Sequence, residues 1–207
     1  MRKVIVAFLL ASALAQTEPQ RSVRGETLVS RGLPAARFTL SRNFHYVGGQ
    51  VINLYGNAEA EQHLFVETQN GLMKSFCWLQ FEHFLPSNKM SYDYKMDRSV
   101  KIGDLNFIYD VKAYRDYPGL TMNDPGSDSM AIAQLAAAHH LTFPKRVARV
   151  RMFFLPTPDR RTELMIIYGE AIDWDVPGDE VSLDDNRPDV AKITVEHARE
   201  NLSIQSF

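Results

Sequence analysis

Aromatic and ionisable side chains alternate between residues 61 and 82, in a spacing that could bind a small molecule. Asn70-Gly71 lies near the middle of this segment and favours a two-residue hairpin turn, because both central positions of a type I′ turn need positive φ. Such a turn would place Phe65 opposite Phe76 and His63 opposite Trp78. One face of the hairpin would then carry Glu61, His63, Phe65, Glu67, Lys74, Phe76, Trp78, Gln80 and Glu82.

A sheet face open to water rarely carries three large aromatic rings side by side. We therefore predict a cavity or groove on this face, in which aromatic walls supply contact area and His63, Gln80 and Glu82 orient the ligand. The opposite face, which includes Cys77 and Leu79, is expected to be the main core. In the alternative interpretation the aromatic face is a second buried layer under a helix or the N-terminal arm. One extra loop residue would reverse the two faces.

A second candidate position lies in the segment 110–127, which is expected to be the longest loop of the domain. Arg115 lies there between Tyr114 and Tyr117 and could bind an anion or stack on a ring. The alternative is a crossover from sheet to helix. The predicted ligand-binding residues are therefore Glu61, His63, Phe65, Phe76, Trp78, Gln80, Glu82 and Arg115.

Motifs for covalent or metal chemistry are missing from the sequence. It contains no G-x-S-x-G, H-E-x-x-H, Walker or G-x-G-x-x-G pattern, so no catalytic residue, metal site or cofactor is predicted. The segment 173–184 resembles an EF-hand calcium loop in part, but Pro177 and Asp184 depart from that pattern and a solvated acidic loop is expected. Cys77 is the only cysteine, and its apolar strand favours a buried thiol.

The elements that must position these residues are mostly strands. Apolar segments of five to twelve residues alternate with Gly, Asn, Asp and Pro, a pattern typical of antiparallel sheets. Strands are predicted at 37–41, 44–55, 61–68, 72–84, 99–102, 105–113, 146–155 and 162–172, and helices at 129–141 and 188–202. These elements predict an α+β, β-rich fold, in which two helices pack on a curved antiparallel sheet or partly closed barrel.

The N-terminal residues have the features of an export signal. Arg2 and Lys3 precede an apolar run, and Ala13-Leu14-Ala15 is typical of a signal-peptidase site. We expect a signal peptide at 1–15, an irregular arm at 16–36 and one β-rich domain at 37–207, with the mature protein in the periplasm or outside the cell. Apolar runs are too short to predict a membrane span. The formal net charge of −2 argues against nucleic-acid binding by bulk charge.

Three kinds of function follow from these residues. The first is an exported protein that binds a small apolar or amphipathic ligand against the aromatic face. The second is an exported enzyme that uses His63 with Glu61 or Glu82 as an acid–base pair. The third is a structural or interaction module without a small-molecule site, and a protein partner is not identified by the sequence.

Overall fold

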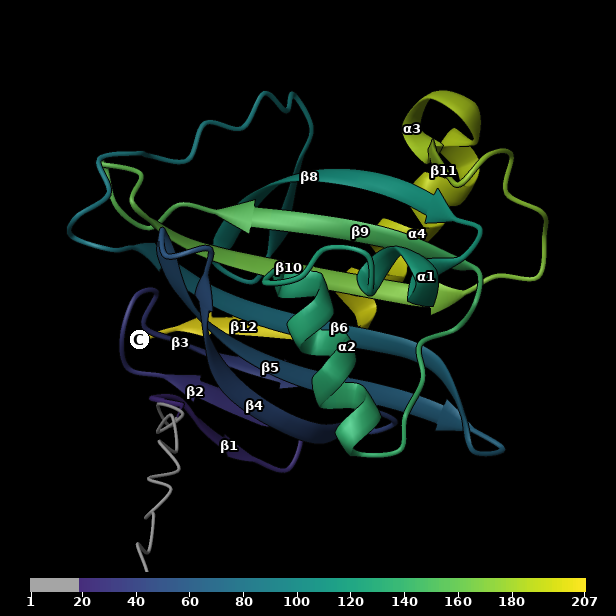
Figure 1. The fold of residues 1–207 in the computed structure, drawn as a ribbon, viewed down its shortest axis with the longest axis horizontal. Helices are drawn as coiled ribbons and strands as arrows, with labels where there is room; N and C mark the ends of the chain where they lie inside the picture. Colours follow the sequence, from purple (N-terminus) through teal and green to yellow (C-terminus); the bar gives the residue numbers. More distant parts are fainter. Residues whose placement is uncertain (1–18) are drawn as a thin grey trace, which may run out of the picture.

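The computed structural model describes residues 19–207, which form two antiparallel sheets and four helices (Figure 1). The large sheet has the strand order β11(Glu180–Ser182), β8(Leu105–Tyr114), β9(Val147–Phe154), β10(Thr162–Ala171), β6(Leu72–Phe84), β5(Ala58–Gln69), β4(His45–Leu54), and β7(Ser99–Ile102) also pairs with β8. The small sheet has the order β1(Ser22–Arg24), β2(Thr27–Ser30), β3(Ala36–Leu40), β12(Leu202–Ser206). The helices are α1(Tyr117–Thr121), α2(Asp128–Ala138), α3(Leu183–Asn186) and α4(Pro188–Asn201).

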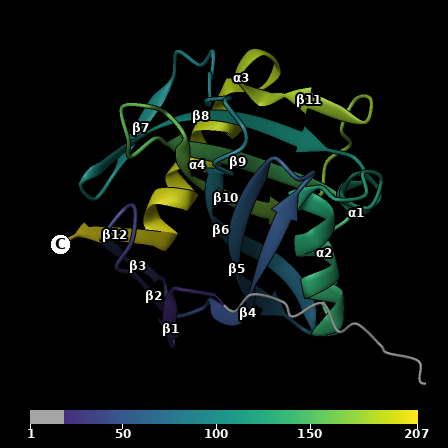
Figure 2. The ribbon, with the colours of Figure 1, turned by 60° about the vertical axis from the view of Figure 1, so that its left-hand side comes forward.

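The large sheet is the central layer, and both of its faces are covered (Figure 2). Helices α1 and α2 cover one face, here called the α2 face, whose buried side chains include Leu64, Phe76 and Trp78. Helix α4 and the small sheet cover the other, the α4 face, whose buried side chains include Phe65 and Cys77. Both sheets are antiparallel and neither closes, so the curved α+β fold is confirmed and a barrel is not formed.

Local sequence patterns predicted most of the strands and helices correctly. All eight predicted strands and both predicted helices are present, with ends that differ by a few residues. Asn70 and Gly71 have φ of 54° and 77°, as a type I′ turn requires. Ser127 caps α2, since its Oγ accepts a hydrogen bond from the Met130 N–H. Cys77 is buried as expected, and burial raises the pKa of its thiol to about 12.

Short elements were missed. Residues 22–30, expected in an irregular arm, form β1 and β2, which meet at a turn where Gly25 has a φ of 58°. Strands β11 and β12 and helices α1 and α3 were also not expected. Elements of three to five residues show too little periodicity for detection and depend on partners distant in sequence. The predicted signal peptide at 1–15 lies outside the described residues.

A bulge in β6 shifts the register of the central hairpin by one residue. Next to the turn, Thr68 pairs with Met73, but beyond it Glu67 pairs with Ser75, and Lys74 is the extra residue. Further along the hairpin, Phe65 is therefore opposite Cys77, not Phe76. The predicted pairing holds only beside the turn, and the predicted composition of the two faces is wrong.

Candidate functional site

The bulge divides the predicted ligand-binding residues between two faces of the large sheet. Glu61, His63 and Phe65 lie on the α4 face, and Phe76, Trp78, Gln80 and Glu82 lie on the α2 face. The side chains of Phe65, Phe76 and Trp78 have no exposed surface. These rings are core residues, as in the alternative interpretation, and they do not form the wall of a cavity.

The structure does bring His63 and Glu61 together, in a buried network. His63 Nε2 lies 2.8 Å from Glu61 Oε1, and the Tyr46 hydroxyl lies 3.0 Å from His63 Nδ1. Arg21 Nη1 donates to Glu61 Oε2 at 2.8 Å. His63 is fully buried and both ring nitrogens have partners, so neither nitrogen is open to a ligand. A cavity of about 300 Å³ lies beside Arg21 and Glu61, whose charges already balance each other.

Arg115 also has a structural role. Its Nε and Nη2 donate to the Val176 carbonyl oxygen at 3.0 and 2.9 Å. Arg115 thus fixes the segment after β10 to the end of β8. The segment 110–127 is shorter as a loop than expected, because β8 continues to Tyr114 and α1 lies within it.

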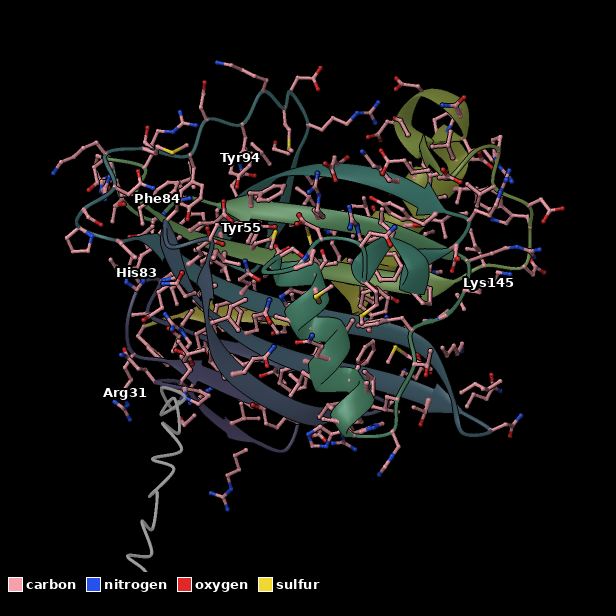
Figure 3. All side chains as sticks on the ribbon, in the orientation of Figure 1. Arg31, Tyr55, His83, Phe84, Tyr94 and Lys145 are labelled. Atoms are coloured by element: carbon pink, nitrogen blue, oxygen red, sulfur yellow. The ribbon has the colours of Figure 1, made fainter. Side chains whose placement is uncertain are left out.

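A cleft of about 370 Å³ opens at one end of the α2 face. Three connecting segments surround it: the β4–β5 turn, the loop 85–98 between β6 and β7, and the end of the α1–α2 connection. Tyr55, Phe84 and Tyr94 gather at this end of the sheet, far from Lys145 at the other end (Figure 3). The cleft is lined by Leu54, Tyr55, Asn57, Ala58, Glu82, Phe84, Tyr94, Asp124, Ser127, Asp128, Arg151, Phe153, Glu163 and Met165.

Aromatic stacking fixes the loop 85–98 at the edge of the cleft. Tyr92 stacks on Phe84 with ring centroids 4.5 Å apart, and Tyr94 stacks on Phe153 at 4.2 Å. Arg160 Nε donates to the Tyr92 carbonyl oxygen at 2.7 Å. The two tyrosine hydroxyls can therefore reach side chains on the floor of the cleft.

Two carboxyl groups form that floor. Glu82 on β6 and Glu163 on β10 are direct cross-strand partners, which places their Cβ atoms about 5 Å apart. The Tyr92 hydroxyl donates to Glu82 Oε1 at 2.6 Å, and the Tyr94 hydroxyl donates to Glu163 Oε2. Glu163 is only 2% exposed, and its Oε1 has no hydrogen-bond partner among residues 19–207.

Burial gives the two carboxyl groups an unusual acidity. It raises the pKa of Glu163 to about 8, with the negative charges of Glu82 and Asp128 acting in the same direction and the Tyr94 hydrogen bond opposing it. Burial also raises the pKa of Glu82. At neutral pH Glu163 is therefore mostly protonated, and the cleft contains a carboxylic acid that can donate a hydrogen bond or a proton.

A row of amide side chains across the sheet holds Glu82 in place. Gln50 Nε2 donates to Gln62 Oε1, Gln62 Nε2 donates to Gln80 Oε1, and each distance is 2.8 Å. Gln80 Nε2 completes the row by donating to Glu82 Oε2 at 2.7 Å. Gln80 and Glu82 are thus the predicted site residues that the structure places at the cleft, Gln80 as a positioning residue and Glu82 in the lining.

Glu163, Tyr94 and Asp128 line the cleft but are not among the predicted site residues. One signal for Glu163 was present, because it alternates with Met165 and Ile167 along β10 and so places a carboxyl group on an apolar face. The loop 85–98 gave a second signal, since long loops are often functional. No local pattern indicates that these segments meet.

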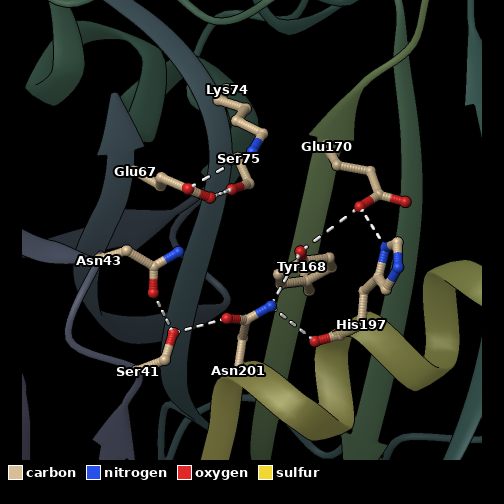
Figure 4. A network of polar contacts seen from close by, with 9 residues as sticks. All are labelled: Ser41, Asn43, Glu67, Lys74, Ser75, Tyr168, Glu170, His197 and Asn201. Carbon is tan, nitrogen blue, oxygen red and sulfur yellow. Dashed lines mark hydrogen bonds and ion pairs between the residues drawn. The ribbon is translucent and has the colours of Figure 1, made fainter. Parts of the chain in front are cut away.

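A second polar network lies between α4 and β10, and its members pair with one another (Figure 4). His197 Nδ1 lies 2.8 Å from Glu170 Oε2, and Asn201 Nδ2 donates to the Tyr168 hydroxyl at 3.4 Å and to the His197 carbonyl oxygen at 2.9 Å. The Ser41 hydroxyl lies 2.5 Å from Asn201 Oδ1. This network joins α4 to the sheets.

Two further findings concern metals and membranes. Residues 19–207 contain no group of three or more His, Cys, Asp or Glu side chains placed to hold a metal ion. Across the same described range, no helix is long and apolar enough to cross a bilayer.

The fold and the cleft define an α+β protein with an open, curved sheet covered on both faces and a mixed polar and aromatic cleft at one end. The chain matches no known protein family, and searches of curated proteins and of solved structures find no similar protein.

Proposed function

We propose that this protein binds a small amphipathic molecule in the cleft between the β4–β5 turn, the loop 85–98 and the N-terminus of α2. The observation that carries the proposal is a buried carboxyl group, Glu163, on the floor of a cavity with aromatic and apolar walls. Small-molecule sites combine a mostly apolar lining with a few fixed polar groups, and their volumes begin at roughly 300 Å³. The ligand's apolar part would contact Phe84, Phe153 and Met165, and its polar part would reach Glu82 and Glu163.

We also propose that the protein is exported. The support is the pattern of residues 1–15, with two basic residues, an apolar run and Ala13-Leu14-Ala15. The mass of the protein purified from outside the cytoplasm should correspond to a chain that begins at Gln16. A mass that includes Met1 would contradict export by this signal.

Two methionines on neighbouring strands allow a test of the binding site. Met165 lines the cleft, and Met152 is buried on the α4 face of the same sheet. With methyl-labelled methionine, a ligand in the cleft should shift the NMR signal of Met165 and leave that of Met152 unchanged. A panel of small amphipathic molecules that bind and shift only Met152, or a panel with no binder, would contradict the proposal.

A second candidate function is acid–base catalysis by Glu163 and Glu82. A carboxylic acid with a pKa of about 8 beside a second carboxyl group is suited to proton transfer at neutral pH. Any turnover found with this protein should then be abolished by Glu163→Gln. It should persist in a folded His63→Gln variant, because His63 is enclosed on the other face.

A further inference from the structure

Negative charge at the cleft exceeds the positive charge available to balance it. Four acidic residues line the cleft, namely Glu82, Glu163, Asp124 and Asp128, and the only lysine or arginine among its lining residues is Arg151. Arg151 is already paired, because it makes two hydrogen bonds to Asp110, including one of 3.1 Å from Nε to Oδ1. The positive charge of Arg151 acts on Glu163 but is shared with Asp110, so the acidic groups of the cleft outnumber the cations that face them.

Glu61 is a buried carboxylate of the same protein whose negative charge is neutralised by a cationic partner. Glu61 on β5 is buried like Glu163 on β10, but Arg21 pairs with it at 2.8 Å and His63 contacts its other oxygen. Glu82 and Glu163 receive hydrogen bonds only from neutral groups, two tyrosine hydroxyls and the Gln80 amide. An ionised carboxyl pair in this position is stable only with a cation beside it.

The geometry also leaves room for such a cation. Glu163 Oε1 accepts no hydrogen bond from residues 19–207 and is not among their buried polar atoms without a partner, so it is open to the cleft that the residue lines. Phe84 and Met165 offer apolar surface next to this position.

We propose that the ligand of the cleft is an organic cation, with an ammonium or guanidinium group bound between Glu82 and Glu163 and an apolar body against Phe84, Phe153 and Met165. This inference rests on the proposed binding function and specifies its ligand class. The cation supplies the charge that the cleft lacks, and its N–H groups supply the donor that Glu163 Oε1 lacks.

Binding should be coupled to loss of a proton. In the empty cleft Glu163 is mostly protonated below pH 8, and a bound cation favours its ionised form, so the proton leaves to solvent. The affinity for a cation should therefore rise from pH 6 to pH 8, by up to about tenfold per pH unit, and then level off. A neutral molecule of the same shape should not show this rise.

Calorimetry with three probes of matched shape tests this inference. The probes are tryptamine, indole-3-ethanol and indole-3-propionate, which are respectively cationic, neutral and anionic at pH 7. We expect tryptamine to bind at least about tenfold more tightly than the other two, with proton release and the stated pH dependence. Glu163→Gln should remove both the preference and the pH dependence, whereas Glu200→Gln, at an exposed position on α4, should change neither.

The outcomes separate the two proposals. Equal or tighter binding of indole-3-ethanol, with a shift of the Met165 signal, would overturn the cationic ligand but leave a binding cleft. Absence of binding by all three probes up to about 1 mM would count against both. If Glu163→Gln does not fold, Glu82→Gln replaces it, and an unchanged preference for tryptamine in that variant would overturn the inference.

Discussion

Two buried glutamates in this protein have opposite acidities because their neighbours differ. Burial alone would raise the pKa of Glu61, but hydrogen bonds from His63 and the Arg21 N–H, together with the Arg21 charge, lower it to about 2. Burial raises the pKa of Glu163 to about 8, and the more distant charge of Arg151 opposes this only in part. Glu61 is therefore suited to a structural role, and Glu163 to proton exchange with a ligand.

The two glutamates should therefore affect stability in opposite ways as pH changes. An ionised Glu61 stabilises the fold above pH 4.5, and its contribution of about 3 kcal/mol is lost as pH falls toward 2. Glu61→Gln should thus be less stable than the unsubstituted protein at pH 7 and approach it near pH 2. The folded protein keeps Glu163 protonated up to its raised pKa of about 8, whereas the unfolded chain ionises it above 4.5. Stability therefore falls as pH rises from 4.5 to 8, and the loss levels off above 8. Glu163→Gln should gain about 3–5 kcal/mol relative to the unsubstituted protein between pH 5 and pH 9.

Urea unfolding of the three proteins at pH 3, 5, 7 and 9 measures these differences. Parallel pH profiles for Glu163→Gln and the unsubstituted protein would show that Glu163 ionises normally. A constant deficit of Glu61→Gln at every pH would show that Glu61 contributes shape and not charge.

At the scale of elements, the sequence predicts strands and turns well and register poorly. Alternation located β6 to the residue, and Asn70-Gly71 located its turn, because both signals are local. The bulge at Lys74 has no such signal, and it moved Phe65 and Trp78 to opposite faces. The cleft could not be predicted either, since it depends on the meeting of three connections whose spacing in the sequence is large.

Deletion of Lys74 tests the role of the bulge. Lys74 is the unpaired residue, and the pairs on either side of it would become continuous without changing face. We expect the deletion to cost about 1 kcal/mol, since the exposed Lys74–Glu67 ion pair contributes little. Insertion of one alanine between Leu79 and Gln80 is the matched control, because it would reverse the faces of half of β6 and should prevent folding. A folded insertion variant would contradict this view of the register.

At the scale of the whole molecule, the small sheet joins the two ends of the described chain. β12 follows α4 directly and pairs with β3, which in turn pairs with β2 (Figure 1). Leu202 and Ile204 on β12 are buried in the core of the α4 face. The segment before β4 and the last residues are therefore parts of one hydrophobic core.

A chain that ends at Asn201 should lose much of its stability. Burial of Leu202 and Ile204 and the pairing with β3 would all be lost, at a cost of about 4 kcal/mol. A chain that ends at Gln205 is the control, because it lacks only the exposed end of β12 and Phe207. Urea unfolding with circular dichroism should show a large shift of the midpoint for the first truncation and a small shift for the second. Equal midpoints would show that β12 is dispensable.

The acidic pair and the walls of the cleft belong to different parts of the fold, so ligand selectivity can change while the core strands stay the same. Glu82 and Glu163 lie on interior strands that also form the core, while the walls of the cleft come from three surface connections. Changes in those connections that keep Tyr92 and Tyr94, whose hydroxyls bind the acidic pair, can alter which molecule is accommodated. Glu82 and Glu163 thus stay as fixed binding groups while the surrounding loops vary, and binding proteins of different selectivity could be engineered on this fold.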